Sequence, residues 1–221
     1  MADIDSPRRR RRKDARPQEL LEAALAVFVE KGFTATRTED VARRAGVSKG
    51  TLFLYYPSKQ KLLEAVIAHY LSARIAAGAA LVAVHQGPVA PSLRARLARM
   101  WCELVDSPAS GVFKLVITEV RNFPEIARFY AREVVEPAHA VLGALVRRGI
   151  AQGEFRDVDV DDTVHSLVLP LIMLCLHRHS LGACGGDSRL DAHRFITFHI
   201  NLVLDGLARP ARADKTEDLV A

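Results

Sequence analysis

Residues 36–59 combine hydroxyl, cationic and glycine residues in a pattern suited to binding phosphate groups rather than to making or breaking bonds. Hydroxyl, guanidinium and ammonium groups donate hydrogen bonds to phosphate oxygens, and glycine allows a backbone to approach a ligand closely. The candidate DNA contacts are Thr36, Arg37, Arg44, Ser48, Lys49, Gly50, Thr51, Leu54, Tyr55 and Lys59. Within this set we expect Lys49, Thr51 and Leu54 to reach the bases.

Short helices are predicted to position these residues. Thr36 and Glu39 have the spacing of a capping box, which predicts a helix that begins near residue 36. Gly46 can adopt the positive φ of a tight turn, and Ser48 can cap a further short helix. With a preceding helix that starts near Pro17, this order predicts a helix-turn-helix. A generic helical hairpin with a basic surface is the alternative.

This segment resembles the TetR (tetracycline repressor-like) family of bacterial regulators over roughly residues 15–75. The matching residues are Gly32-Phe33-x-Ala35-Thr36, Asp40-Val41-Ala42-x-x-Ala45-Gly46-Val47-Ser48-Lys49-Gly50-Thr51-Leu52 and Tyr55-x-x-Ser58-Lys59-x-x-Leu62. Phe53 and Tyr56 depart from the family, which often has tyrosine and usually phenylalanine there. The resemblance implies an all-helical dimer whose first three helices bind operator DNA. It also implies a helical core that often holds a small inducer, and a final pair of helices that joins its twin in a four-helix bundle.

Positive charge is concentrated at the N-terminal end of the chain. The net charge is +5, and the run from Arg8 to Lys13 supplies six positive charges. Residues 1–61 hold 14 basic and 8 acidic residues, whereas residues 62–221 hold 17 basic and 18 acidic residues. We therefore expect a polyanion to dock at the N-terminal part. Residues 1–14 are predicted to be a disordered basic arm, either a solvated tail or an arm lying along phosphates or in a minor groove.

The predicted fold class is all-α, with about nine helices and two functional parts. The expected helices after the DNA-binding segment span about 58–84, 92–106, 111–121, 124–152, 160–180 and 188–208, separated by glycine, proline and serine breakers. Residues 15–61 form the predicted helix-turn-helix DNA-binding domain, and the helix at 58–84 links it to a helical regulatory and dimerisation domain at 62–208. Residues 209–221 are predicted to be a disordered tail.

The regulatory part contains candidate ligand and dimer residues. Aromatic residues, histidines and methionine at helical spacing are typical of core packing, and they also suit a pocket. The candidate pocket residues are Trp101, Phe113, Phe123, Phe129, His139, Leu142, His165 and Met173. The two last helices are strongly apolar, which fits an intramolecular core, a dimer interface or both. The candidate interface residues are Val164, Val168, Leu171, Cys175, Phe195, Phe198 and Leu202.

Other classes of function find little support in the sequence. Cys175, His177, His179 and Cys184 have the composition of a metal site, but residues two apart on a helix point in different directions. We therefore expect no metal and no cofactor. The sequence carries no recognisable catalytic motif. The longest apolar run, 167–176, is about half a membrane span, and we expect a cytoplasmic protein without a membrane partner.

The interpretation is a dimeric, sequence-specific transcriptional regulator that binds palindromic operator DNA. By analogy with the family, it is expected to be a repressor that an unidentified small-molecule inducer releases. The alternative is a ligand-independent architectural DNA-binding protein driven by the arginine arm, which would show weak sequence preference and steep salt dependence. A small helical enzyme would need a catalytic set that the sequence does not display.

Overall fold

Helices account for nearly all of the chain that the structure describes, as the hydrophobic periodicity predicts. The structure is a computed structural model, and it describes residues 7–119, 121–180, 182 and 190–209, with side chains from residue 16 onward. The helices are α1 (Pro7–Lys31), α2 (Thr38–Arg44), α3 (Lys49–Tyr55), α4 (Lys59–Ile67), α5 (Ala73–Ala83), α6 (Val89–Asp106), α7 (Gly111–Glu119), α8 (Pro124–Tyr130), α9 (Glu136–Ala151), α10 (Val160–Arg178) and α11 (Ala192–Leu207).

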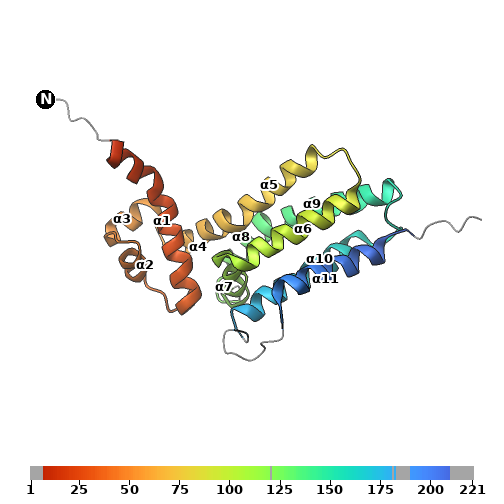
Figure 1. The fold of residues 1–221 in the computed structure, drawn as a ribbon. Coiled ribbons are helices and arrows are strands. Elements are labelled where there is room, and N and C mark those ends of the chain that lie inside the picture. Colours follow the sequence, from red (N-terminus) through yellow and green to blue (C-terminus); the bar gives the residue numbers. More distant parts are fainter. Residues whose placement is uncertain (1–6, 120, 181, 183–189, 210–221) are drawn as a thin grey trace, which may run out of the picture.

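Two pairs of these helices are continuous. The π-helical segment Ala68–Ser72 joins α4 to α5, and a second one, Ala131–Val135, joins α8 to α9. Counted this way, the described residues form nine continuous helices, in agreement with the predicted fold class. Figure 1 shows α1–α3 as a lobe at one end, which α4 connects to a longer lobe built from the later helices.

The first lobe is held together by a small apolar core. Phe28 of α1, Val41 of α2 and Leu52 of α3 are each at most 1% exposed. Ala42 is also buried, and its small side chain lets two helices cross closely. Gly32 and Gly46 end the first two helices with positive φ values of 80° and 65°, a conformation that glycine adopts without steric cost.

Two predicted helix starts in this lobe are wrong. The first helix begins at Pro7, not near Pro17, so residues 7–14 are helical and not a disordered arm. Proline is favoured at a first helical position and arginine has high helix propensity, which accounts for the earlier start. The second helix begins at Thr38 after an Arg37 cap that makes no side-chain hydrogen bond, so the capping box at Thr36 is not formed.

The second lobe packs α6 against α11, α9 against α10 and α10 against both α7 and α11. Leu167 and Leu171 of α10 and Ile200 of α11 are completely buried at its centre. Helix α6 begins at Val89, three residues before the predicted start. The reason is the carboxylate of Glu154, which accepts hydrogen bonds from the Val89 and Ala90 backbone N–H groups at 2.7 and 2.8 Å. Residues 1–6 of the predicted arm, Cys184 and residues 210–221 of the predicted tail lie outside the described residues.

Candidate DNA interface and ligand groove

Helix α3 presents a short, capped polar surface. The Ser48 hydroxyl accepts a hydrogen bond from the Thr51 backbone N–H at 3.1 Å, as predicted, and lies 2.9 Å from the Thr51 hydroxyl. Leu52 faces the core, whereas Lys49 and Gly50 are exposed and Thr51 is half-buried. The free N–H groups and positive dipole end of the helix therefore lie beside a lysine, which is a favourable place for a phosphate.

The exposed face of α3 also carries apolar side chains. Leu54 is 84% exposed and Phe53 is 38% exposed. The Lys49 ammonium lies 5.6 Å from the centroid of the Phe53 ring, a cation–π arrangement. Exposed apolar groups on a recognition helix can contact thymine methyl groups. Phe53 is thus a candidate contact that the sequence interpretation left out; its place beside the predicted contact Leu54 was the available signal.

Basic residues of this lobe are partly paired with acidic ones. Lys49 lies 2.6 Å from Glu39, and Arg44 lies 2.7 Å from Glu30. The hydrogen bond from Lys49 lowers the pKa of Glu39 below its usual value. These pairs are exposed, so each stabilises the fold little. A phosphate can replace the carboxylates as the partner of both cations.

Two of the predicted DNA contacts, Thr36 and Lys59, instead make hydrogen bonds within the lobe. Thr36 is 2% exposed, and its hydroxyl donates to the Gly32 carbonyl at 2.7 Å, so it cannot reach DNA without opening the lobe. Lys59 donates to the carbonyl oxygens of residues 33, 34 and 36 at 2.8–3.1 Å. Burial lowers the pKa of Lys59. Its ammonium holds the loop between α1 and α2 and is not available to a phosphate.

That loop is also where the two lobes meet. Glu119, at the end of α7, is 7% exposed, and its carboxylate accepts hydrogen bonds from the Thr34 hydroxyl at 2.9 Å and the Thr34 N–H at 3.4 Å. Phe33 packs edge-on against Phe123, with ring centroids 4.9 Å apart. We call Thr34, Lys59, Glu119, Phe33 and Phe123 the interlobe joint. It connects the DNA-binding lobe to α7 and α8 through both polar and apolar contacts.

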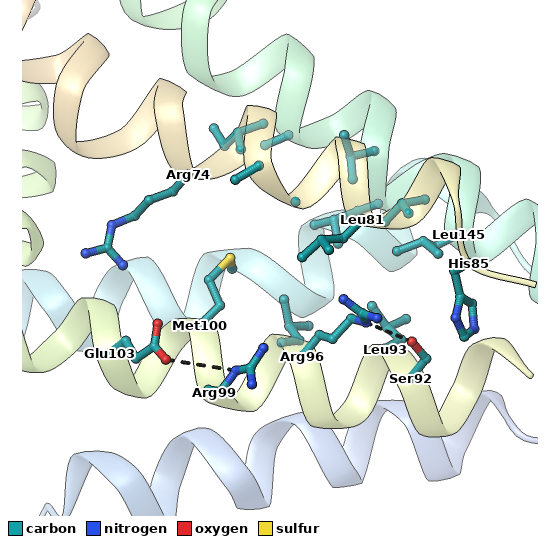
Figure 2. A pocket seen from close by; sticks show the side chains of 18 residues that line it. Arg74, Leu81, His85, Ser92, Leu93, Arg96, Arg99, Met100, Glu103 and Leu145 are labelled. Atoms are coloured by element: carbon teal, nitrogen blue, oxygen red, sulfur yellow. Dashed lines mark hydrogen bonds and ion pairs between the residues drawn. The ribbon is translucent and has the colours of Figure 1, made fainter. Parts of the chain in front are cut away.

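A groove of about 290 Å³ runs between α5, α6 and α9 in the second lobe. Figure 2 shows Arg74 at one end with Met100 and Glu103 nearby, and His85 with Ser92 at the other end. Between the ends lie leucines that include Leu81, Leu93 and Leu145. The volume is at the lower limit for small-molecule sites, and the lining combines an apolar middle with polar ends.

The predicted pocket residues mostly lie elsewhere. Only Leu142 lines the groove. Trp101 and Phe113 are buried core residues whose rings stack 6.0 Å apart, and Met173 is 62% exposed on α10. Phe123 belongs to the interlobe joint and Phe129 packs against the core. His139 lies 3.4 Å from Asp161 and 5.8 Å from the His165 ring, also outside the groove.

The predicted dimer residues divide into two sets. Val164, Leu171 and Cys175 are at most 3% exposed and belong to the core of one chain, so they are not surface residues. Phe198 and Leu202 are 62% and 60% exposed, whereas Val168 and Phe195 are half-buried. The exposed set extends to residues that the sequence interpretation did not assign to an interface, Leu169 at 56% and Met173 at 62%.

A helix-turn-helix lobe joined to a larger helical lobe defines the class of helical DNA-binding regulators. The family model for bacterial regulatory proteins of the tetR family matches residues 20–66, and the model for a tetracyclin repressor-like C-terminal domain matches residues 83–182. The chain belongs to the TetR family of transcriptional regulators.

Similar proteins extend over most of the chain. An uncharacterized HTH-type transcriptional regulator of Bacillus subtilis, YfiR, is 30% identical over 166 residues, which are 71% of this chain and 76% of that protein. The transcriptional repressor KstR2 of Rhodococcus jostii is 27% identical and covers 90% and 94% of the two chains. DNA binding and transcriptional regulation are therefore the activity of this family and of its named members.

Solved structures share the fold at lower identity. FadR of Bacillus subtilis in complex with stearoyl-CoA has a TM-score of 0.64 and 16% identity, covering 86% of this chain and 98% of that one. A regulator from Saccharomonospora viridis in complex with choline has a TM-score of 0.70 and 21% identity, covering 89% and 99%. At these identities the likeness establishes the shared helical architecture.

Proposed function

We propose that this protein is a cytoplasmic homodimeric repressor that leaves its palindromic operator when a small molecule binds between α5, α6 and α9. The observation that carries the proposal is the groove itself, because one of its walls is part of the helix that supports the DNA-binding lobe. Two structural neighbours hold small molecules, stearoyl-CoA and choline, which supports a ligand-responsive role for the second lobe.

The dimer proposal rests on the exposed apolar face of α10 and α11. Leu169, Met173, Phe198 and Leu202 are each at least 56% exposed. Contiguous exposed apolar residues mark interaction surfaces, and an isologous dimer would bury this face against itself. Helix α10 also has the length and composition of a membrane span, as does the α4–α5 helix. We assign the apolar surface of α10 to a second copy of the chain because its family binds DNA.

The coupling proposal follows the α4–α5 helix. Helix α4 packs against α1 with Leu62, Leu63 and Val66 buried, while α5 lines the groove at the other end of the same helix. A ligand that changes the position of α5 would therefore move α4 and the DNA-binding lobe. In a dimer this changes the separation of the two α3 helices, and operator half-site spacing is fixed by the duplex.

The contact assignment is tested by gel shift on DNA flanking the gene. Lys49→Ala should lower operator affinity by roughly 10- to 100-fold, as the loss of a base or phosphate contact does. Arg147→Ala is the matched control, because Arg147 is exposed on α9 in the other lobe. Equal affinity of both variants would contradict the placement of α3 on DNA.

The dimer is tested by light scattering after size exclusion. A double change, Phe198→Glu and Leu202→Glu, should yield a monomer and reduce operator affinity, because the two half-sites would be bound independently. Val84→Glu is the control, since Val84 is 72% exposed at the end of α5 and distant from the α10–α11 face. A double variant that stays dimeric would overturn the interface proposal.

A further inference from the structure

We infer that the groove takes an elongated apolar molecule with an anionic end group, whose charge is compensated by Arg74 at one end of the groove or by Arg96 towards the other end. This inference rests on the proposed function of the groove and specifies its ligand class.

The middle of the groove fits an apolar chain. Most of its lining is aliphatic: Ile75, Ala77, Leu81, Val82, Leu93, Leu97, Met100, Val141, Leu142 and Leu145. The 11-residue helix α5 contributes apolar residues here, yet none of its residues is buried in the protein. From Arg74 to Val82, the last groove residue within α5, the wall extends about 12 Å at the helical rise per residue. A long groove of only about 290 Å³ favours a narrow chain over a bulky ring system.

The space beside Gly78 is part of this channel. A Cβ atom built on Gly78 would meet none of the described atoms within 4 Å apart from its chain neighbours and the backbone of its own helix, so the glycine leaves room that a larger side chain would fill. Glycine in the middle of a helix is unfavourable by roughly 0.5–1 kcal/mol relative to alanine. A glycine that is not required by backbone conformation or by close packing is consistent with a wall kept open for a ligand.

The charges of the groove favour an anion. Its lining includes three arginines, at positions 74, 96 and 99, and one carboxylate, Glu103. That carboxylate lies 3.9 Å from Arg99, which leaves two positive charges in excess. Among the described residues, Arg74 and Arg96 form no ion pair; the Arg96 Nε donates to the Ser92 hydroxyl at 3.1 Å. Both are half-buried, which makes a charge-assisted bond to a ligand stronger than at an open surface.

The same lining is unsuited to the other main ligand chemistries. A quaternary ammonium group is recognised by aromatic faces, and among the residues that the structure describes no phenylalanine, tyrosine or tryptophan lines the groove. A neutral polar ligand would leave the two arginines uncompensated. The anionic end can be a carboxylate or the phosphates of an activated ester, because guanidinium groups bind both.

Binding is measured first without DNA, by calorimetry and thermal shift on the full chain, with dodecanoate, dodecanoyl-CoA, dodecanol and dodecyltrimethylammonium below their micelle concentrations. We expect dodecanoate or dodecanoyl-CoA to bind at least about tenfold more tightly than dodecanol, since hydrogen bonds to charged groups are strong. The tighter of the two anions identifies its source. Equal binding of the alcohol, tighter binding of the ammonium compound, or binding of none of the four would overturn the inference.

Variants then locate the charge and the chain. The double change Arg74→Gln and Arg96→Gln should lower anion affinity at least about tenfold and leave dodecanol affinity unchanged, because each glutamine keeps a hydrogen-bond donor without charge. Gly78→Leu should abolish binding of the anion and of dodecanol. The variant should unfold at a temperature near that of the unchanged protein. Arg147→Gln is the control for loss of a cation outside the groove. Unchanged anion binding in the double variant would overturn the role of the arginines.

The response of DNA is a separate readout. An anion that binds in the groove but leaves the operator complex intact would refute ligand release while supporting the ligand class. Release by a compound that is not an apolar anion would refute the ligand class while supporting the proposed function.

Discussion

The DNA-binding lobe and the groove wall use their apolar residues in opposite ways. In α1–α3 large apolar side chains form a buried core, among them Phe28, Val41 and Leu52, and the helices are fixed by capping and turn residues. The residues of α5 are also mostly apolar, yet none of them is buried in the protein. The difference indicates that the DNA-binding lobe is rigid. Helix α5 has few packing constraints and is therefore more easily repositioned.

Leucine truncation tests this difference most directly. Leu52→Ala should lower the free energy of unfolding by about 2–5 kcal/mol, the usual cost of a cavity in a packed core. Leu81→Ala on α5 should change it by less than about 0.5 kcal/mol, because Leu81 is 47% exposed. Chemical denaturation measures both values. Comparable losses in the two variants would mean that α5 is packed as tightly as the DNA-binding lobe.

The interlobe joint provides the next largest effect. Glu119→Ala removes the acceptor of the Thr34 N–H and hydroxyl bonds, and it should cost about 1–3 kcal/mol of stability. It should also weaken the effect of a groove ligand on operator binding, because α7 then no longer holds the α1–α2 loop. Thr118→Ala is the control on the exposed side of α7. A full ligand response in Glu119→Ala would show that the interlobe joint is not needed for coupling and would leave the α4–α5 helix as its route.

Capping of α3 gives a smaller expected change. Ser48→Ala removes the acceptor of the Thr51 N–H bond and should cost about 1 kcal/mol, along with a loss of operator affinity. Thr36→Ser keeps the hydroxyl that donates to Gly32 and should leave operator affinity unchanged. Thermal melts and gel shifts distinguish them; an affinity loss in Thr36→Ser similar to that in Ser48→Ala would mean that the side chain of Thr36 contributes to DNA binding beyond its internal hydrogen bond.

Substitution of two glycines by alanine should give the smallest changes in stability, and these should have opposite signs. Gly46→Ala should be destabilising by roughly 1 kcal/mol, since φ is +65° there. Gly78→Ala should be stabilising by about 0.4–1 kcal/mol, because it lies in a regular helix with open space at its Cβ. Equal signs in denaturant titrations would contradict the contrast between a constrained turn and an open wall.

The helix order, the turn at Gly46 and the cap at Ser48 could be predicted because they depend on local sequence. The Ser48 cap is formed, and Ser58 caps α4 in the same way, its hydroxyl accepting from the Lys61 N–H at 3.1 Å. Thr36 was mistaken for a cap because its hydroxyl has a competing local acceptor, the Gly32 carbonyl. Sequence spacing alone does not show which partner such a hydroxyl selects.

The groove and the dimer face could be predicted less well because they depend on long-range packing. Helix α10 is apolar on most sides, so periodicity cannot separate Leu171, which is buried, from Leu169, which is exposed. The sequence predicts a pocket lined mainly by aromatic residues, whereas aliphatic residues, Arg74 and Arg96 line the groove. Arginines of this kind are indistinguishable in sequence from solvated surface residues until α5 and α6 are placed together.

The π-helical segment between α4 and α5 sets the angle between the face of α4 that packs on the DNA-binding lobe and the face of α5 that lines the groove. Its hydrogen bonds run one residue further along the chain than those of an α-helix, so it accommodates an additional residue. Each residue turns an α-helix by about 100°. If the same residues formed a regular α-helix through Ala68–Ser72, Arg74 and Gly78 would be rotated away from the groove by about that angle relative to α4. The π-helical turn, and not side-chain chemistry, therefore keeps the surface that meets the ligand aligned with the surface that carries the DNA-binding lobe.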